Sequence, residues 1–137
     1  MSFVHQHQVR FHETDAAGVV YFANVLTLCH EAYESSLAAS GVNLKAFFGG
    51  DGEIAVPIVH ADIDFRRPIF CGDRLKIHLT PQSQDIHTFE ITYQITDTAD
   101  KADLLAKALT RHVCIALSDR KRRPLSPEIT HWIEQWH

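Results

Sequence analysis

The chain has 137 residues, of which 45% are hydrophobic and 22% are charged, and its formal net charge is -4 at pH 7. This length is typical of one domain with one core, and the composition excludes an intrinsically disordered protein. An acidic chain lacks the basic surface that binding to nucleic-acid phosphates requires. We therefore expect a single domain over residues 1–137 and no nucleic-acid partner.

The N-terminal segment and the cysteines favour a cytoplasmic location. No apolar run approaches the roughly 18 residues of a membrane span, and the first residues lack the basic start and apolar stretch of a signal peptide. Cys29, Cys71 and Cys114 are an odd number of widely spaced cysteines, unlike a disulfide framework or a clustered zinc site. We expect an intact cytoplasmic protein with free thiols, no membrane partner, no cofactor and no metal.

The first third of the chain predicts a strand, a turn and a long helix. Residues 4–11 alternate, with Val9 and Phe11 on one side. A polar turn follows over residues 12–18. Apolar residues then recur at helical spacing over residues 22–40, where Asn24 can cap the first turn and Gly41 is a stop signal.

Four strand-like segments and a short helix make up the rest. The segments lie at residues 54–67, 74–80, 86–96 and 105–117, after a glycine-rich loop at 47–52. Each has a period of two, so each should bury one face in an antiparallel sheet. In the last segment the apolar positions are Leu109, Val113, Ile115 and Leu117.

The last element is a helix that begins after Ser126, a capping residue, with Pro127 at its first position. Trp132 and Trp136 lie on its apolar stripe and should face the core. A strand, a long helix and a run of four strands predict an α+β fold, in which an antiparallel five-stranded sheet wraps around the long helix.

The most informative stretch for function is residues 12–24. It places Asp15 and Gly18 just before a helix N-terminus, where free backbone N–H groups and the helix dipole can hold a developing negative charge. An oxyanion site for acyl transfer needs this arrangement, and a nearby carboxylate can attack a carbonyl or deprotonate water. The alternative is that Thr14 and Asp15 are only turn and cap residues.

The run TDAAGVVYFAN at residues 14–24 resembles the signature loop of the 4-hydroxybenzoyl-CoA thioesterase family, which has the hot-dog fold. The run AVPIV at residues 55–59 resembles the segment after the family's central helix, and the likeness covers nearly all of the chain. Within the family, residues 14–34 are most similar to the 1,4-dihydroxy-2-naphthoyl-CoA hydrolases of phylloquinone biosynthesis. The resemblance implies an acyl-CoA thioesterase that acts as a homodimer or homotetramer.

The resemblance also implies roles for single residues. Asp15 becomes the catalytic carboxylate, as nucleophile or general base, and the backbone N–H of Phe22 becomes the oxyanion donor. Gly18 keeps the loop close to the substrate. Short-chain relatives carry a histidine where this chain has Phe22, so the departure favours an aromatic acyl group. The substrate-binding residues implied in this way are Gly18, Tyr21, Phe22, Val59 and His60.

Two other sets of polar residues compete with Asp15. His60, Asp62 and Asp64 alternate along a strand, so they share a face that is either solvated or a metal site. In the resembled fold this strand lies near the dimer interface and the neighbour's active site, where His60 can line the substrate pocket. The other set is on the long helix and comprises His30, Glu31 and Glu34. Other hot-dog thioesterases place their carboxylate on that helix, which makes Glu31 the rival to Asp15.

Basic residues offer candidate contacts for the phosphates of coenzyme A, because the arginine fork matches phosphate oxygens. They are Arg66, Arg67 and the cluster at residues 120–123, and the alternative is a solvated surface.

We expect hydrolysis of an aryl-CoA thioester, most of all 1,4-dihydroxy-2-naphthoyl-CoA, without metal. The alternatives are a thioesterase for 4-hydroxybenzoyl-CoA or short-chain acyl-CoA, a metal-dependent hydrolase that uses the His60 set, and a non-catalytic acyl-CoA binding protein.

Overall fold

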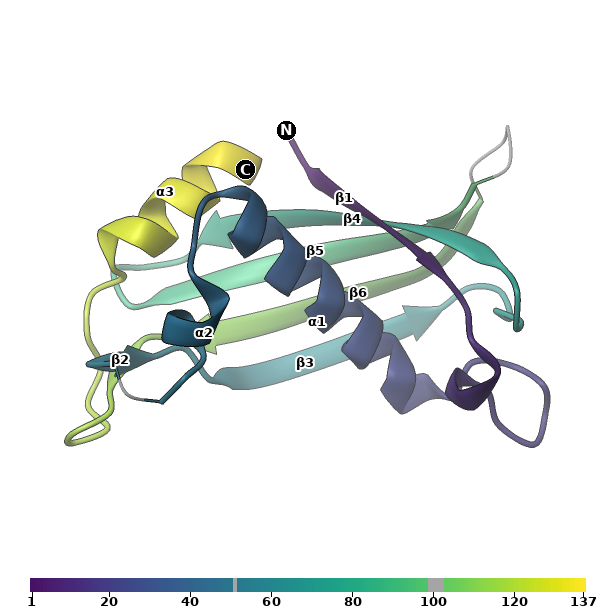
Figure 1. The fold of residues 1–137 in the computed structure, drawn as a ribbon, viewed down its shortest axis with the longest axis horizontal. Helices are drawn as coiled ribbons and strands as arrows, with labels where there is room; N and C mark the ends of the chain where they lie inside the picture. Colours follow the sequence, from purple (N-terminus) through teal and green to yellow (C-terminus); the bar gives the residue numbers. More distant parts are fainter. Residues whose placement is uncertain (51, 99–102) are drawn as a thin grey trace.

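The computed structural model describes residues 1–50, 52–98 and 103–137 of the chain. Among these residues, five strands form one antiparallel sheet in the order β1-β4-β5-β6-β3, and two short strands, β2 and β7, pair separately (Figure 1). This confirms the predicted α+β architecture. The elements are β1 (Phe3–Gln8), the 3-10 helix η1 (Phe11–Glu13), α1 (Phe22–Ala39), α2 (Leu44–Phe47), β2 (Ile54–Ala55), β3 (Ile58–Phe65), β4 (Arg74–Ser83), β5 (Thr88–Asp97), β6 (Leu104–Val113), β7 (Ile115–Ala116) and α3 (Pro127–Trp136).

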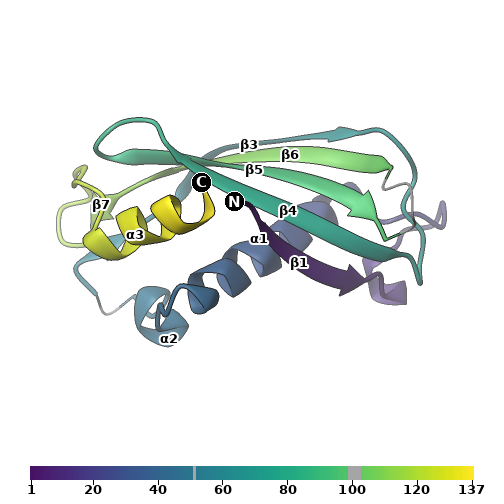
Figure 2. The ribbon, with the colours of Figure 1, turned by 90° about the horizontal axis from the view of Figure 1, so that it is seen from above.

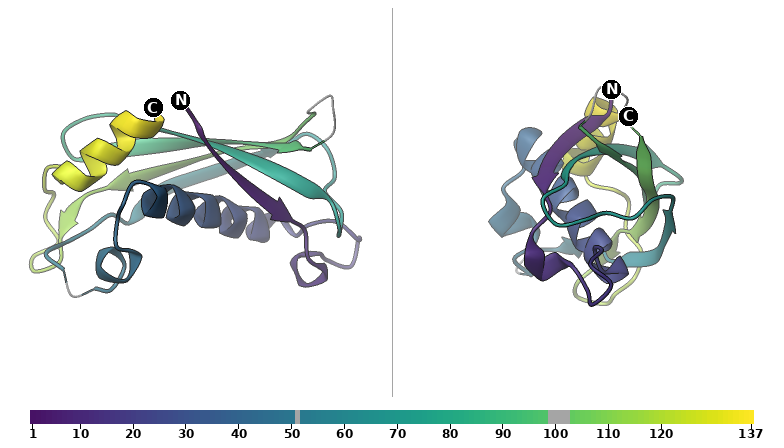
Figure 3. Two further views of the ribbon diagram at one scale, coloured as in Figure 1. Left: turned by 45° about the horizontal axis from the view of Figure 1, so that its top comes forward. Right: turned by 90° about the vertical axis from the view of Figure 1, so that its right-hand side faces the viewer.

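Helix α1 lies across one face of the sheet, and the sheet curves around it (Figures 2 and 3). The helix begins at Phe22 and ends at Ala39, within one residue of the predicted span. Its buried stripe packs against the inward-facing residues of the sheet, which explains why the apolar residues recur at helical spacing. The stripe comprises Val25, Leu28, Cys29, Ala32, Tyr33, Ser36 and Leu37.

Helix α3 closes one end of the core, as its apolar stripe predicted. The Ser126 side chain accepts a hydrogen bond from the backbone N–H of Ile129, and Pro127 is the first helical residue. Trp132 is fully buried and donates from Nε1 to the Ser36 hydroxyl of α1 at 2.9 Å. No helix among the described residues has the length and apolar character of a membrane span.

The predicted boundaries of the first strand and helix need two corrections. Strand β1 ends at Gln8, and the exposed Phe11 belongs to the following 3-10 helix rather than to the strand's apolar face. Asn24 does not cap α1, because Tyr21 is the N-cap residue and the Asn24 amide donates instead to the backbone carbonyl of Glu13 at 2.9 Å. The side chain therefore fastens the helix to the preceding loop.

The segment predicted as one strand over residues 54–67 is two strands. Pro57 stands between them, and its ring removes a backbone N–H from the ladder. Strand β2 pairs with β7, whereas β3 pairs with β6 at the edge of the main sheet. Helix α2, which the sequence did not predict, lies where a glycine-rich loop was expected to begin.

The buried face of β6 also differs from the prediction. In the middle of β6 the inward-facing side chains are Ala106, Ala108, Thr110 and His112, and Leu109 lies only half-buried on the opposite face. Leu105 and Val113, near the ends of the strand, are also buried, so the prediction holds for Val113 and is wrong for Leu109. Tyr33 of α1 packs on this inner face, with its ring centroid 5.1 Å from that of His112. Small residues and a neutral imidazole fit under the helix where large aliphatic residues would not, so apolar character alone indicated the wrong face.

Candidate active site

The loop before α1 is folded tightly around Asp15. The backbone N–H of Asp15 donates to the carbonyl of Val19 at 2.9 Å, and the carboxylate oxygen Oδ1 accepts from the backbone N–H of Ala17 at 2.8 Å. Gly18 occupies the turn with a φ of 81°, in the left-handed region that favours glycine. The sequence therefore holds an exposed carboxylate in a defined position just before the helix.

Two segments distant in sequence meet at this loop. The N–H of Val20 donates to the carbonyl of Ile69 at 2.8 Å, and Val19 forms an isolated bridge with Phe70. Between the loop and the chain that leaves β3 lies a pocket of about 460 Å³. Its lining residues are Asp15, Val19, Val20, Tyr21, Phe22, Phe65, Arg66, Arg67, Pro68 and Ile69.

Exposed aromatic side chains form much of the pocket's rim. The rings of Tyr21 and Phe22 lie against each other with centroids 4.8 Å apart, and both are exposed to about half of their surface, as is Phe65 across the pocket. Aromatic rings stack on one another in offset or tilted pairs. This surface therefore suits a flat, apolar acyl group.

The first turn of α1 supplies hydrogen-bond donors beside this pocket. Phe22 is the first residue of the helix, and among the described residues its backbone N–H finds no backbone acceptor. The first turn carries no acidic side chain that would neutralise the positive end of the helix dipole. The geometry thus provides an N–H group and a carboxylate on the same pocket, which acyl transfer requires.

The loop is fastened from behind by Glu13. Its backbone carbonyl accepts from the N–H of Tyr21 and from the Asn24 amide, both at 2.9 Å. Its buried carboxylate accepts from the N–H of Arg10 at 2.7 Å and lies 2.9 Å from Nε2 of His7. Burial alone raises the pKa of Glu13, but these hydrogen bonds and the nearby histidines outweigh it and lower that pKa below its usual value.

The structure divides the predicted site residues into two groups. Asp15, Tyr21 and Phe22 line one pocket, and Gly18 shapes its loop. Val59 and His60 lie near the opposite end of β3 from Phe65 and do not line the pocket within one chain. The sequence did not identify Pro68 and Ile69 as site residues. They follow β3, and only the fold brings them beside residues 19–20.

The two rival carboxylate sets lie elsewhere. Glu31 faces His5 and His7 of β1 and borders a separate hollow with His30 and Glu34, away from Asp15. His60 and Asp62 form an exposed pair at 3.0 Å. Within the described chain, His60, Asp62 and Asp64 do not gather their ligand atoms around one point, whereas His5, His7 and Glu31 do.

The basic residues also separate into two places. Arg66 and Arg67 line the pocket with Asp15, and Arg67 pairs with Asp103 at 3.3 Å while staying largely exposed. The cluster at residues 120–123 lies near β7 and borders a different hollow through Arg123. Only the first pair is therefore placed to meet a ligand that extends out of the pocket.

Comparisons with known proteins found a family model and relatives that match nearly the whole chain. The model of the Thioesterase-like superfamily matches residues 9–133. The chain is 56% identical over 134 residues to a 1,4-dihydroxy-2-naphthoyl-CoA hydrolase from Nostoc punctiforme, covering 98% of this chain and 88% of that protein. It is 53% identical to the hydrolase of the same name from Trichodesmium erythraeum, covering 97% of this chain and 96% of the other.

A solved structure shares the fold. The crystal structure of a 1,4-dihydroxy-2-naphthoyl-CoA thioesterase from Synechocystis superposes with a TM-score of 0.90 at 45% sequence identity, covering 97% of this chain and 96% of that one.

Proposed function

Because the chain belongs to the Thioesterase-like superfamily, we propose that it hydrolyses 1,4-dihydroxy-2-naphthoyl-CoA to 1,4-dihydroxy-2-naphthoate and coenzyme A. The hydrolases from Nostoc and Trichodesmium support this substrate, since they match nearly the whole chain at more than half identity. The observation that carries the proposal is the pocket shared by the Asp15 carboxylate, the Phe22 backbone and an aromatic rim. A flat naphthoyl group fits such a rim.

The reaction adds water across the thioester. Asp15 either attacks the carbonyl carbon, forming an anhydride that water then hydrolyses, or removes a proton from the attacking water. In both cases the carbonyl oxygen becomes negative and accepts a hydrogen bond from the Phe22 N–H. The carbon–sulfur bond then breaks, and the coenzyme A thiolate takes up a proton. Arg66 and Arg67 line the same pocket, and in this proposal they bind the coenzyme A phosphates.

We further propose that the working unit is a homodimer or homotetramer joined along β3. In the described sheet β3 is an edge strand, and both of its faces are largely exposed, including Ile58, Val59 and Phe65. An exposed apolar edge strand favours pairing with a second copy. Antiparallel pairing brings the start of one strand to the end of the other. Val59 and His60 then reach the pocket beside Phe65 of the second copy.

Two wider proposals follow from the same resemblance. We propose one thioesterase domain in residues 1–137 and a role for its reaction in phylloquinone biosynthesis. A cytoplasmic location is supported by three free thiols, two of them buried, which is the usual state of cysteines in a reducing compartment.

A substrate panel tests the proposed activity. Purified protein is given the 1,4-dihydroxy-2-naphthoyl, 4-hydroxybenzoyl and acetyl thioesters of coenzyme A, and released coenzyme A is measured by chromatography because Cys71 is exposed to thiol reagents. We expect the naphthoyl thioester to have the highest kcat/KM, and hydrolysis to persist in EDTA. A preference for acetyl-CoA would contradict the aryl assignment.

The Asp15→Asn variant tests the catalytic carboxylate. The amide keeps the size of the side chain but can neither attack nor take a proton. We expect kcat to fall by about 100-fold or more, while the unfolding temperature stays unchanged because Asp15 is exposed. Glu34→Gln, at an exposed carboxylate on α1, is the matched control and should retain kcat. The assignment of Asp15 fails if Asp15→Asn stays fully active.

A further inference from the structure

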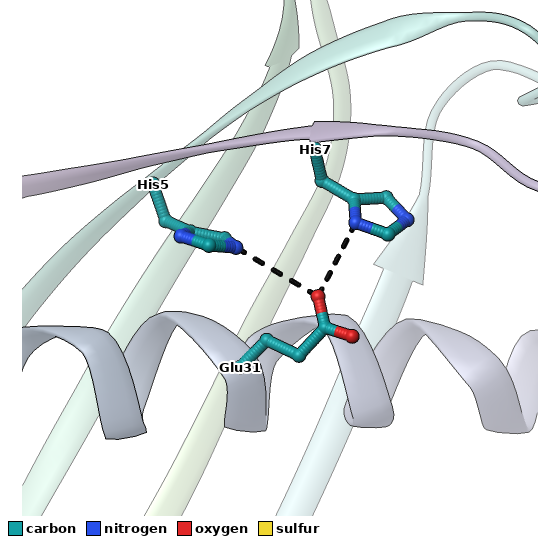
Figure 4. Close-up of side chains that lie close together, drawn as sticks. All are labelled: His5, His7 and Glu31. Carbon is teal, nitrogen blue, oxygen red and sulfur yellow. Dashed lines mark ion pairs between the residues drawn. The ribbon is translucent and has the colours of Figure 1, made fainter.

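A group of three polar side chains joins β1 to α1 at the side of the sheet opposite β3. His5 and His7 are two residues apart on a strand, so they point to the same face, and Glu31 reaches toward them from the helix (Figure 4). Glu31 Oε2 lies 3.2 Å from Nδ1 of His7 and 3.7 Å from Nε2 of His5. One ligand atom from each residue lies within 4.8 Å of the other two.

The orientation of His7 is set by a second carboxylate. Its Nε2 lies 2.9 Å and 3.1 Å from the two oxygens of Glu13, which is buried and already accepts from the backbone N–H of Arg10. Carboxylate oxygens accept hydrogen bonds, so Nε2 is the donor in this pair. In a neutral ring the lone pair is then on Nδ1, directly facing Glu31 Oε2. Two lone pairs in this arrangement call for a cation between them.

We propose that His5, His7 and Glu31 form a binding site for a divalent transition-metal ion, with Zn²⁺ as the ion that fits best. Imidazole nitrogen and carboxylate oxygen are its usual ligands. At metal–ligand distances of about 2.0–2.1 Å, tetrahedral geometry separates the ligand atoms by about 3.3 Å, close to the separations of Glu31 Oε2 from both rings. Glu13 is the outer carboxylate that orients a metal-bound histidine.

The surroundings leave room for the remaining ligand. The side chain of His7 is largely buried, whereas that of Glu31 is 42% exposed, so the site opens to solvent on the helix side. Water can then complete the coordination shell, and Glu31 can turn to shorten its distances to the ion. The site is on β1, and the proposed pairing along β3 does not cover it.

A bound ion would hold the start of α1 in position and stabilise the folded chain, and it would not contact the thioester. None of its three ligands lines the pocket of Asp15. Through His7, however, it connects to Glu13, whose backbone carbonyl holds Tyr21 and Asn24 at the start of α1. A bound ion would tie β1, α1 and the catalytic loop together. The proposal is therefore independent of which thioester the enzyme cleaves.

Calorimetric titration of the untagged protein with ZnCl₂, after removal of metals by a chelator, tests the site. We expect one Zn²⁺ per chain and a higher unfolding temperature with the ion, because binding to the folded state stabilises it. Glu31→Gln and His5→Ala should abolish both effects. Glu13→Gln should weaken binding by about 10- to 100-fold as an outer-shell change. The exposed His131→Ala is the control and should bind like the unaltered protein.

Three results would overturn the site. One is the absence of one-to-one Zn²⁺ binding to the unaltered protein, which would leave a protonated His7 as the cation between Glu13 and Glu31. Another is unchanged binding in Glu31→Gln and His5→Ala, with circular dichroism showing that both variants are folded. The third is equal weakening by His131→Ala, which would indicate general binding to surface histidines.

Discussion

The two edge strands of the sheet, β1 and β3, differ in how far the chain covers their side chains. Alternate side chains of β1 turn toward α1, where His5 and His7 meet Glu31 of the same chain. Strand β3 has a similar alternation, yet Val59 and Phe65 remain about half-exposed. The side chains of β1 thus find partners within the chain, whereas those of β3 are the ones that the proposed second copy would cover. Exposed apolar side chains on an edge strand are the feature on which the proposed pairing rests.

The histidines at or next to each edge differ in the same way. His7, on β1, is largely buried and lies between two carboxylates. His112, on β6 beside β3, is fully buried, and no acidic side chain in the described part of the chain pairs with it: Nδ1 lies 3.2 Å from the carbonyl of Val56, and Nε2 lies 3.0 Å from the Thr110 hydroxyl. Burial lowers the pKa of His112 to about 4. The histidine on the β1 side therefore has carboxylate partners, whereas the histidine on the β3 side is a neutral ring with neutral partners.

Matched valine substitutions test the difference between the edges most directly. Val59 and Val4 are both exposed in one chain, on β3 and β1 respectively. Val59→Lys would place an unpaired charge in the proposed contact, so we expect the solution mass to fall to that of a monomer. Because the second copy then no longer completes the pocket, kcat/KM should fall by about 100-fold.

Val4→Lys should change neither the mass measured by light scattering nor kcat/KM. The proposed contact along β3 is wrong if Val59→Lys changes neither the mass nor kcat/KM. If only Val4→Lys dissociates the protein, the contact lies along β1 instead.

The neutral histidine predicts a loss of stability in acid. The pKa of His112 is about 4 in the folded chain, against 6.5 as its ordinary value. As the pH falls from 6.5 to 4, the unfolded chain binds a proton that the folded chain does not. The free energy of unfolding should therefore decrease over this window, by about 3 kcal/mol. Urea unfolding at several pH values measures it.

The variant His112→Gln removes this titration and should flatten the pH dependence between pH 6.5 and 4. The matched control is His131→Gln on the exposed side of α3, which should keep the original slope. A slope that persists unchanged in His112→Gln would mean that other groups cause the acid sensitivity.

On the β1 side, Glu13→Gln probes the charged partner of His7. The amide keeps the shape of the side chain but loses its charge. A charge-assisted hydrogen bond is then replaced by a weaker neutral one, so the free energy of unfolding at pH 7 should fall by about 1 kcal/mol. Since the pKa of Glu13 is lowered in the folded state, its stabilisation is present above pH 4.5 and is lost as the pH falls below that value.

The difference between Glu13→Gln and the unaltered protein should therefore narrow in acid. Glu134→Gln, on the exposed side of α3, is the control and should have no effect at either pH. A loss of stability that stays constant down to pH 3 would show that shape, rather than charge, matters at Glu13.

Thiol labelling of Cys71 tests where the proposed contact along β3 ends. The label should leave the free energy of unfolding unchanged. Cys71, after the end of β3, is exposed, whereas Cys29 on α1 is buried, and burial raises its pKa to about 12. Burial also raises the pKa of Cys114. We expect one label per folded chain, found by mass spectrometry on Cys71, and three labels in denaturant. Protection of Cys71 would extend the contact beyond β3.

The sequence by itself determined the elements whose signals are local. The apolar period of α1, the Ser126–Pro127 cap of α3 and the alternation of the middle strands each depend on neighbours in the chain, and so does the turn that presents Asp15. The family resemblance at residues 14–24 added two predictions, Asp15 as the catalytic carboxylate and the backbone N–H of Phe22 as the oxyanion donor.

Only the tertiary structure decided which face of β6 is buried, because the space under α1 selects Ala108 and His112 over Leu109. It also brought Glu31 beside His5 and His7, and it placed Asp15 and Phe65 on one pocket, although these residues are distant in sequence. Such contacts depend on how a helix and a curved sheet fit together, and local periodicity carries no information about that fit. The exposure of Val59 and Phe65 on β3 is likewise visible only in the tertiary structure.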